Sequence, residues 1–256
     1  MSVLAFDTAT RATTVALVDA AGDTMLARDD PDPGQRPAHT TRLMALIEEL
    51  LAAGGGWSAV DTIAVGTGPG TFTGLRIGIA TALALGRARD LPVAGISTLA
   101  SLALAADTAA AQDGFDVVLA VLDARRREVF AAGWTAGALT AATAGRATAP
   151  VSGRSDRPEA RIELLGPAVL GPDALVAASE PLGRRLAVGD GALEYRSVLE
   201  TGGITVAPPS CAHHRVEAAV HARLARAGLA VSGDAVRPQY LRAPDAELSR
   251  RASPAS

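Results

Sequence analysis

The stretch VGTGPGTFTGLRIG, residues 65–78, places closely spaced glycines and three threonines between an apolar run and a helix-like one. Glycine-rich turns at such a junction often bind phosphate, because their backbone N–H groups can surround an anion. The lysine that a phosphate-binding loop places after its glycine is missing, and all 24 basic residues are arginine. Gly68, Gly70 and Thr71 are therefore candidates for nucleotide contact, but the motif does not indicate ordinary phosphate chemistry.

Asp7 ends an apolar run near the N-terminus and is followed by Thr8 and Thr10 in a turn. In a phosphotransferase, a carboxylate and hydroxyls placed in this way approach the phosphate and a metal-bound water. The alternative is an ordinary turn in which Asp and Thr side chains hydrogen-bond to the nearby backbone. Spacing alone favours the ordinary turn and leaves nucleotide binding open.

Two further turns could complete such a site. Asp123 follows a second apolar run and precedes three arginines; the alternative there is a solvated basic turn. Gly189, Asp190 and Gly191 lie between a predicted strand and a predicted helix, where the base or ribose of a nucleotide could bind. A lone Gly-x-Gly is a weak signal, and a turn that starts a helix explains it equally well.

Metal binding is not indicated. The residues of metal-ligating type on the last predicted helix are His213, His214, Glu217 and His221. Their spacing matches neither H-x-x-x-H nor H-E-x-x-H, so we expect a surface helix with solvated histidines and no metal. His39 stands alone at the start of the first long helix, which it could cap.

Nucleophilic catalysis is not indicated either. Cys211 has histidines nearby only along a helix and lacks the third group that would orient such a base, and the serine-nucleophile motif G-x-S-x-G does not occur.

The composition bounds the class of protein. The chain has 256 residues, of which 48% are hydrophobic and 20% charged, with a net charge of −3. This length suits one large domain or two small ones, and the negative charge argues against an autonomous nucleic-acid binder. A single cysteine excludes an internal disulfide and fits a reducing compartment. The sequence has no basic N-terminal segment, and none of its uncharged apolar runs approaches the ~20 residues that a membrane span needs. We therefore expect a cytoplasmic protein with no membrane contact.

Hydrophobic periodicity and turn residues predict two rounds of similar elements. In the first round, strands are expected at 2–8, 60–66 and 92–96, and a hairpin over 13–30. One helix is expected to end near residue 53, a second to span 74–90, and a third to span 97–112 with Ser97 as its cap. In the second, strands are expected at 116–124, 127–135, 185–190 and 203–207, and helices over 171–180, 192–200 and 211–228. Residues 136–161 read as a loop with at most one edge strand.

This order predicts an α/β protein with a duplicated ribonuclease-H-like fold, the two-lobed architecture of the actin-like ATPase superfamily. We expect an N-terminal lobe over 1–113, on which the helix near 210–228 could pack, and a C-terminal lobe over 114–209. Residues 229–256 would form a C-terminal extension whose end is disordered.

The sequence resembles the TsaB (YeaZ) family, most specifically at GTGPGTFTGLRIGIATALALG, residues 66–86, followed by PVAGISTLASLA, residues 92–103. The motifs LAFDTAT, AHTTRLMALIEELL, LDARRREVF and RPQYLR agree, and they extend the resemblance to residue 242. The family is bacterial and belongs to the actin-like ATPase superfamily. Its members are partners of TsaD, which transfers a threonylcarbamoyl group onto the adenosine next to certain tRNA anticodons. TsaE, an ATPase, completes the complex, and TsaC supplies threonylcarbamoyl-AMP.

The resemblance implies a non-catalytic scaffold. TsaD follows its similar helix and strand with a metal-binding H-x-x-x-H, but residues 95–103, GISTLASLA, contain no histidine. The resemblance implies that the chain has no cofactor of its own: the partner holds the metal, and ATP or ADP binding is weak or absent. It also implies that the chain reaches tRNA only through the complex. The glycine loop would then be kept for its shape, with Thr71 or Thr73 capping the next helix.

A stripe of small residues is the predicted partner interface. Gly74, Gly78, Ala82 and Gly86 recur every four positions on the helix over 74–90, flanked by Leu75, Ile79 and Leu83. Such a stripe lets another helix approach closely, and the resemblance between TsaB and TsaD here favours TsaD as its partner, or a second copy when the chain is alone. The alternative is that the stripe packs on the chain's own sheet.

Two other functions compete with the scaffold. One is an active nucleotide hydrolase or kinase that uses Asp7 and Asp123. The other is a protease, an activity once proposed for these families, for which the sequence offers neither metal ligands nor a nucleophile constellation.

Overall fold

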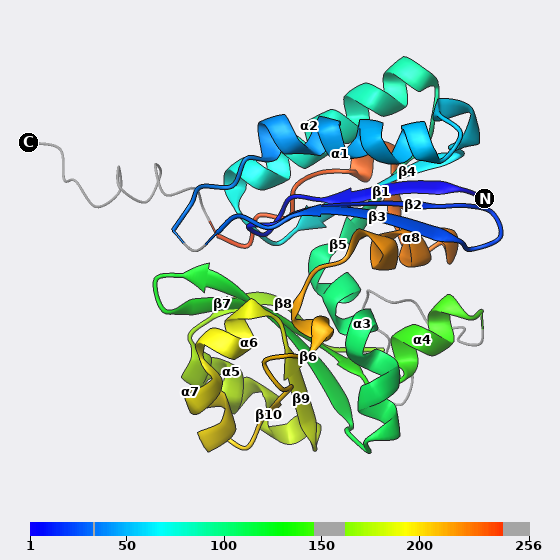
Figure 1. The fold of residues 1–256 in the computed structure, drawn as a ribbon. Helices are drawn as coiled ribbons and strands as arrows, with labels where there is room; N and C mark the ends of the chain where they lie inside the picture. Colours follow the sequence, from blue (N-terminus) through cyan, green and yellow to red (C-terminus); the bar gives the residue numbers. More distant parts are fainter. Residues whose placement is uncertain (33, 146–161, 243–256) are drawn as a thin grey trace, which may run out of the picture.

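The computed structural model describes residues 1–32, 34–145 and 162–242, which form two lobes, each built on a mixed β-sheet (Figure 1). The first sheet has the order β11-β5-β4-β1-β2-β3. Its strands are β1 (Val3–Asp7), β2 (Thr13–Val18), β3 (Thr24–Asp29), β4 (Thr62–Gly68), β5 (Val93–Ser97) and β11 (Val231–Ser232). The strands β1, β2 and β3 pair antiparallel, β1, β4 and β5 pair in parallel, and β11 adds an antiparallel edge to β5.

The second sheet repeats this arrangement with the order β10-β9-β6-β7-β8. Its strands are β6 (Val117–Arg125), β7 (Glu128–Thr135), β8 (Glu163–Leu170), β9 (Arg185–Val188) and β10 (Thr205–Val206). Again three antiparallel strands are followed by two parallel ones. The duplicated ribonuclease-H-like fold predicted from the element order is therefore confirmed.

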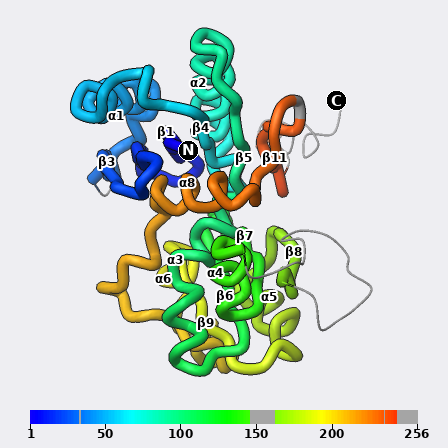
Figure 2. Tube along the Cα trace, turned by 90° about the vertical axis from the view of Figure 1, so that its right-hand side faces the viewer, coloured from blue at the N-terminus to red at the C-terminus, as the bar shows by residue number. Residues whose placement is uncertain are grey.

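Helices cover both sheets and fill the space between them. The longer ones are α1 (His39–Ala53), α2 (Phe72–Arg89), α3 (Thr98–Gln112) and α8 (Ala218–Arg226); the shorter ones are α4 (Ala138–Thr143), α5 (Pro172–Ser179), α6 (Asp190–Glu194) and α7 (Arg196–Thr201). Figure 2 shows α1 and α2 on the outer side of the first sheet, with α8 between the lobes. No helix in the described ranges is long and apolar enough to cross a membrane.

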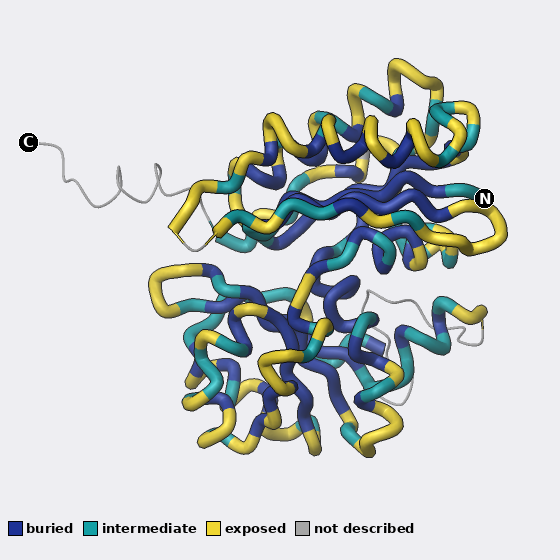
Figure 3. Tube along the Cα trace, in the orientation of Figure 1, coloured by how far each residue is buried: buried dark blue, intermediate teal, exposed yellow. Residues whose placement is uncertain are grey.

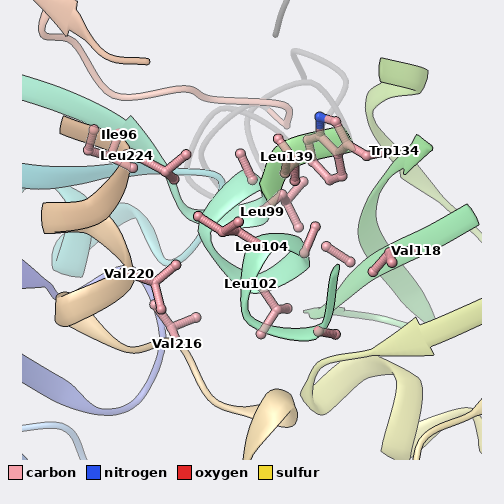
Figure 4. Packing of buried hydrophobic residues seen from close by; sticks show 14 of the residues in the cluster. Ile96, Leu99, Leu102, Leu104, Val118, Trp134, Leu139, Val216, Val220 and Leu224 are labelled. Carbon is pink, nitrogen blue, oxygen red and sulfur yellow. The ribbon is translucent and has the colours of Figure 1, made fainter. Parts of the chain in front are cut away.

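Strand alternation assigns the two faces of the first sheet, because successive side chains point in opposite directions. Leu4 and Phe6 pack in one cluster with residues of α1, whereas Val3 and Ala5 belong to the cluster around α3 and α8. That second cluster continues into the other lobe through Val118 of β6. Figure 4 shows it close up, with side chains from α3, α8 and both sheets packed together. One hydrophobic layer therefore joins the lobes.

The caps of two helices were predicted correctly. Thr71 accepts a hydrogen bond from Gly74 N–H at the start of α2, and Ser97 accepts one from Ala100 N–H at the start of α3. Residues 136–161 were predicted as a loop, but 138–143 form α4, and 146–161 lie outside the described residues. The strands β8 and β11 were not anticipated.

The last helix begins later than predicted, at Ala218 rather than near 211. Residues Ala212–His214 form a short 3-10 turn, because the His214 ring is held by backbone groups of other segments. The helix itself contacts β1 and β2 of the first sheet. The lobe boundaries at 113, 209 and 229 stay a prediction, and residues 243–256 lie outside the described chain.

Candidate functional site: the cleft between the lobes

A cavity of about 430 Å³ lies between the lobes, where the first hairpin turn of each half meets the last described residues. Its lining comes from Ala9–Arg11, Gly70–Phe72, Leu122–Arg125, Phe130, Asp190 and Gln239–Arg242. Five of the candidate nucleotide-binding residues line it: Thr10, Gly70, Thr71, Asp123 and Asp190. The other five are not in this lining: Asp7, Thr8, Gly68, Gly189 and Gly191.

Asp7 ends β1 but lies inside the protein, with none of its surface exposed. Its Oδ1 accepts a hydrogen bond from Ala9 N–H at 2.6 Å, and its Oδ2 accepts one from the Thr98 hydroxyl at 2.8 Å. His221 Nε2 lies 2.9 Å from the same Oδ2. Gly66 on β4 makes room for this carboxylate, because a Cβ there would overlap Oδ2. Asp7 is thus fully engaged within the protein and turned away from the cleft.

The carboxylate of Asp7 ends a buried chain of hydrogen bonds that sequence spacing does not reveal. His221 Nδ1 lies 2.8 Å from Ser101 Oγ, which completes a Ser–His–Asp series across α3, α8 and β1. This is the residue order of many hydrolases, but Ser101 is 1% exposed and the other two are 0% exposed. No substrate carbonyl can reach the serine, so the series fastens the two helices to the sheet and does not support a protease.

The expectation of solvated histidines is wrong for His214 as well as for His221. The His214 ring is buried, with Nδ1 3.1 Å from Gly189 N and Nε2 3.0 Å from Ala207 O. Gly189 and Gly191 allow α6 to approach β6, since a Cβ on Gly189 would overlap the Val121 carbonyl. A Cβ on Gly191 would likewise crowd the backbone of the same strand. This Gly-x-Gly is a packing feature.

The sequence allowed His39 to cap α1, but in the structure it does not. The cap residue is Ala38, and the buried His39 ring instead places Nδ1 2.8 Å from the Thr13 hydroxyl. Burial lowers the pKa of His39 below its ordinary value, and the charges of Asp7 and Asp29 oppose that shift. The imidazole therefore belongs to the packing around the first turn.

The glycine loop closes over the first turn. Thr71 N–H donates to Ala9 O at 2.7 Å, and the Thr8 hydroxyl donates to Gly74 O at 2.8 Å. A Cβ on Gly70 would overlap the Ala9 carbonyl, and one on Gly74 would overlap the Thr8 carbonyl. Gly70 and Gly74 thus permit backbone-to-backbone contact, and the loop contacts protein where a phosphate-binding loop would contact an anion.

The second turn is open to the cleft but its carboxylate has a cation beside it. Asp123 Oδ1 accepts a hydrogen bond from Arg125 N–H at 2.8 Å, and Oδ2 pairs with the Arg125 guanidinium at 3.0 Å. Asp190 Oδ1 accepts from Asp123 N–H at 3.0 Å. Although Asp190 is exposed as a residue, surrounding protein atoms raise the pKa of its carboxyl, and the charge of Asp123 adds to the effect.

The turn itself has an unusual backbone. Arg126 and Arg127 form the two-residue loop between β6 and β7, with φ of 57° and 63°, and Arg125 has φ of 63°. In the described ranges, Asp90 is the one other non-glycine residue with positive φ. A left-handed backbone costs an L-residue roughly 1–2 kcal/mol, and hairpin loops of this kind usually carry Asn-Gly.

The end of the described chain crosses the cleft from one lobe to the other. Gln239 N–H donates to Thr67 O at 2.8 Å in the first lobe. Tyr240 stacks on Phe72 with ring centroids 5.2 Å apart. Arg242 then pairs with Glu128 of the second lobe at 2.8 Å. RPQYLR, the last motif of the resemblance, is therefore a strap along the cleft, a role that its sequence did not indicate.

The predicted partner interface on α2 is wrong for most of its residues. The small-residue stripe is buried in this single chain, together with the flanking side chains Leu75 and Ile79; the stripe consists of Gly74, Gly78, Ala82 and Gly86. A Cβ on Gly78 would overlap the Thr8 hydroxyl, and one on Gly86 would crowd Val93 of β5. Leu83 alone of the predicted set is exposed, at 43%. The small-residue stripe correctly indicated that another surface approaches α2 closely, and that surface belongs to the chain's own first sheet and its first turn.

Within the described ranges, no group of three or more His, Cys, Asp and Glu residues is placed to hold a metal ion.

Comparison with known proteins identifies the relatives of this chain. Residues 35–152 match the family model of TsaD, tRNA N6-adenosine threonylcarbamoyltransferase. The tRNA threonylcarbamoyladenosine biosynthesis protein TsaB of Escherichia coli is 38% identical over 51% of this chain and 53% of its own length. The protein of the same name from Haemophilus influenzae is 40% identical over 51% and 52%. The match thus spans about half the length of these curated relatives.

A solved structure extends the similarity to nearly the whole chain. YeaZ from Pseudomonas aeruginosa superposes with a TM-score of 0.66 at 26% identity, covering 94% of this chain and 99% of that one. Two ribonuclease-H-like halves around a cleft form the duplicated, actin-like fold. Among proteins of this fold, the chain is similar to those named TsaB and YeaZ.

Proposed function

We propose that this chain is a non-catalytic scaffold subunit for the formation of threonylcarbamoyladenosine on tRNA, working in the cytoplasm beside a TsaD-type transferase. The observation that carries the proposal is the position of Asp7. A carboxylate at the end of the first strand would organise phosphate or metal in an active relative, and here it is buried and hydrogen-bonded to Thr98 and His221.

The rest of the cleft supports the same proposal. The glycine loop contacts the Thr8–Ala9 backbone where a nucleotide phosphate would bind, and Asp123 is paired with Arg125. The carboxylates that end the first strand of each half, Asp7 and Asp123, are therefore both engaged by other groups of the chain, whereas metal-assisted phosphoryl chemistry would need them for the metal. In this proposal the transferase partner supplies the metal, a TsaE-type ATPase joins the complex, and tRNA is reached through that complex. A homodimer of the chain alone remains compatible with it.

The test is a reconstituted modification assay with the transferase and ATPase of the same organism, tRNA and threonylcarbamoyl-AMP. Modified tRNA should form at a substantial rate only when this chain is added, and Asp123→Ala should leave at least half of that rate. A variant that lost the rate as fully as a metal-ligand substitution in the transferase, while still folded and in the complex, would contradict the scaffold role.

The cavity itself favours a second candidate, an active nucleotide hydrolase or kinase. It holds about 430 Å³ with Asp123 and Asp190 in its lining, room for part of a nucleotide. ATP turnover by the purified chain separates the two. The scaffold predicts a rate no higher than that of a sample lacking protein, whereas turnover that disappears in Asp123→Ala supports the enzyme.

A further inference from the structure

A second cavity, of about 540 Å³, lies between the lobes, beside α8 and the segment that follows it. Ser97 of β5 lines it from the first sheet, and Trp134 of β7 and Glu163 of β8 line it from the second. Among the described residues, Gln239 alone lines both this cavity and the cleft described above. A volume of this size is typical of small-molecule sites. The molecule therefore has a second place where a ligand fits.

Trp134 carries a buried donor that lacks an acceptor. The strand β7 around it is buried along most of its length, as the colouring of Figure 3 shows, and Trp134 itself is 1% exposed. No acceptor among the described residues lies within hydrogen-bonding distance of its indole Nε1. Figure 4 shows this nitrogen on the side of the ring turned away from Leu99 and Leu104. Buried donors are satisfied with few exceptions, so this N–H indicates a position where a ligand or a water supplies the acceptor.

Glu163 adds an unpaired carboxylate beside the ring. It is the residue of β8 that pairs with Trp134 of β7, so the two side chains stand on the same face of the second sheet. Glu163 is half-buried, and within the described part of the chain its carboxylate makes no hydrogen bond or ion pair. Burial raises the pKa of this carboxyl. A cation placed here would gain both an opposite charge and an aromatic ring next to it.

Apolar side chains form the wall that α8 and the next segment contribute. Leu224, Leu229 and Val231 line the cavity, and Val231 is 46% exposed although it is a large hydrophobic residue. Arg237, the other charged residue of the described wall, already interacts with other protein groups. The cavity thus offers an N–H that lacks an acceptor, a carboxylate that lacks a cation and an apolar surface. A ligand that matches all three has an ammonium group, an oxygen close to it and an apolar body.

We propose that this cavity binds an apolar α-amino acid, with the ammonium group at Glu163 and a carboxylate oxygen accepting from Trp134 Nε1. Both contacts involve an ionised group, which makes such hydrogen bonds stronger than neutral ones. A single carbon separates the two polar groups of an α-amino acid, and this suits two protein groups on directly paired positions of neighbouring strands. The inference does not depend on the function proposed above. Ordered water is the competing occupant, and the test separates the two.

The experiment is isothermal titration calorimetry of the purified full chain with L-leucine, L-methionine and L-phenylalanine. At least one of them should give saturable binding. For that amino acid, the matched acid without the ammonium group and the matched amine without the carboxylate should each bind about tenfold more weakly or worse. Glu163→Gln should raise the Kd about tenfold or more, and Trp134→Phe, which keeps a ring but loses the N–H, about three- to tenfold.

Glu180→Gln is the matched control, because it makes the same change at an exposed residue outside the described lining, and its Kd should stay within about twofold of wild type. The melting temperature of Glu163→Gln should not fall, since the change removes an unpaired, half-buried charge. No binding by any of the three amino acids leaves ordered water as the occupant and overturns the inference. An equal rise in Kd for Glu163→Gln and the control overturns it too.

A second measurement keeps the assignment testable if the Trp134→Phe protein does not fold. The chain has two tryptophans, so Trp57→Phe leaves Trp134 as its one fluorophore. The amino acid that binds should shift the emission of this variant, because the indole N–H gains an acceptor. Emission that stays unchanged at saturating amino acid would place the binding elsewhere and overturn the inference.

Discussion

The first turns of the two lobes occupy equivalent places in two copies of one topology, yet they differ in almost every contact. At the β1–β2 turn the carboxylate is turned inward, with Asp7 buried under His221 and the glycine loop closed over Thr8. The β6–β7 turn is turned outward, with Asp123 in the cleft and Arg125 64% exposed. The comparison teaches that the same strand order can bury the carboxylate at one turn and leave the one at the other turn at the cleft.

The largest expected effect tests this contrast at the two carboxylates. His221→Ala should lower the free energy of unfolding by about 3–5 kcal/mol, because it removes one hydrogen-bonding partner of the buried Asp7 carboxylate and leaves a cavity in place of the ring. Asp123→Ala in the second turn should cost about 1 kcal/mol or less, since the Arg125 side chain that pairs with it is 64% exposed to solvent. Urea denaturation of both variants measures the two values, and similar losses would remove the distinction between the turns.

A smaller loss is expected when the glycine loop is forced away from the first turn. Gly74→Ala should lower the free energy of unfolding by about 1–3 kcal/mol, because its methyl group would overlap the Thr8 carbonyl. Gly171→Ala is the control in the second lobe, where nothing lies within 4 Å of the added carbon and φ is −67°. That control should stay within about 0.5 kcal/mol of wild type; a Gly74→Ala protein as stable as the control would show that the loop can open freely.

The second turn should respond with the opposite sign. Arg126→Asn combined with Arg127→Gly should raise the free energy of unfolding by about 1 kcal/mol, because left-handed backbone is cheap for the new residues. Thermal and urea unfolding would both detect this gain. A clear loss of stability would mean that the arginine side chains hold the hairpin together.

The smallest effect is a pH dependence confined to the first turn. Burial lowers the pKa of His39, so the unfolded chain takes up a proton near pH 6.5 and the folded chain only at lower pH. The unfolded state therefore binds more protons in that window, and stability falls as the pH drops from about 6.5. In His39→Gln this part of the fall should be absent, although the acid groups facing it, Asp7 and Asp29, remain. Parallel pH profiles for the variant and the wild type would contradict the assignment.

Most of the fold could be predicted from sequence because local signals encode it. Apolar periodicity placed the order of strands and helices, and the caps Thr71 and Ser97 follow from residue type at a helix start. Strand β11 is only two residues long, and no residue of β8 is fully buried, so neither carries a clear periodic pattern. Short or evenly exposed edge strands depend on pairing, which a local pattern does not contain.

The candidate site was predicted only in part, because its decisive contacts join distant residues. His221 reaches Asp7 across 214 positions, and a histidine on a helix shows nothing in sequence about what it will meet. The stripe from Gly74 to Gly86 correctly indicated a close approach but could not name the approaching surface. Small residues permit contact with a sheet and with a second helix equally well.

The helix α8 lies between the lobes yet covers β1 and β2, which precede it by about 200 residues in the sequence. A nascent chain that has reached residue 209 holds every strand of the first sheet except β11, while the sheet's inner face still lacks α8. Until Ala218–Arg226 emerges, that face lacks the part of its cover that α8 provides, and the Asp7 carboxylate lacks His221. Long-range closure of this kind is slow and leaves apolar surface exposed during synthesis. The lobe that is made first is therefore the lobe that is finished last.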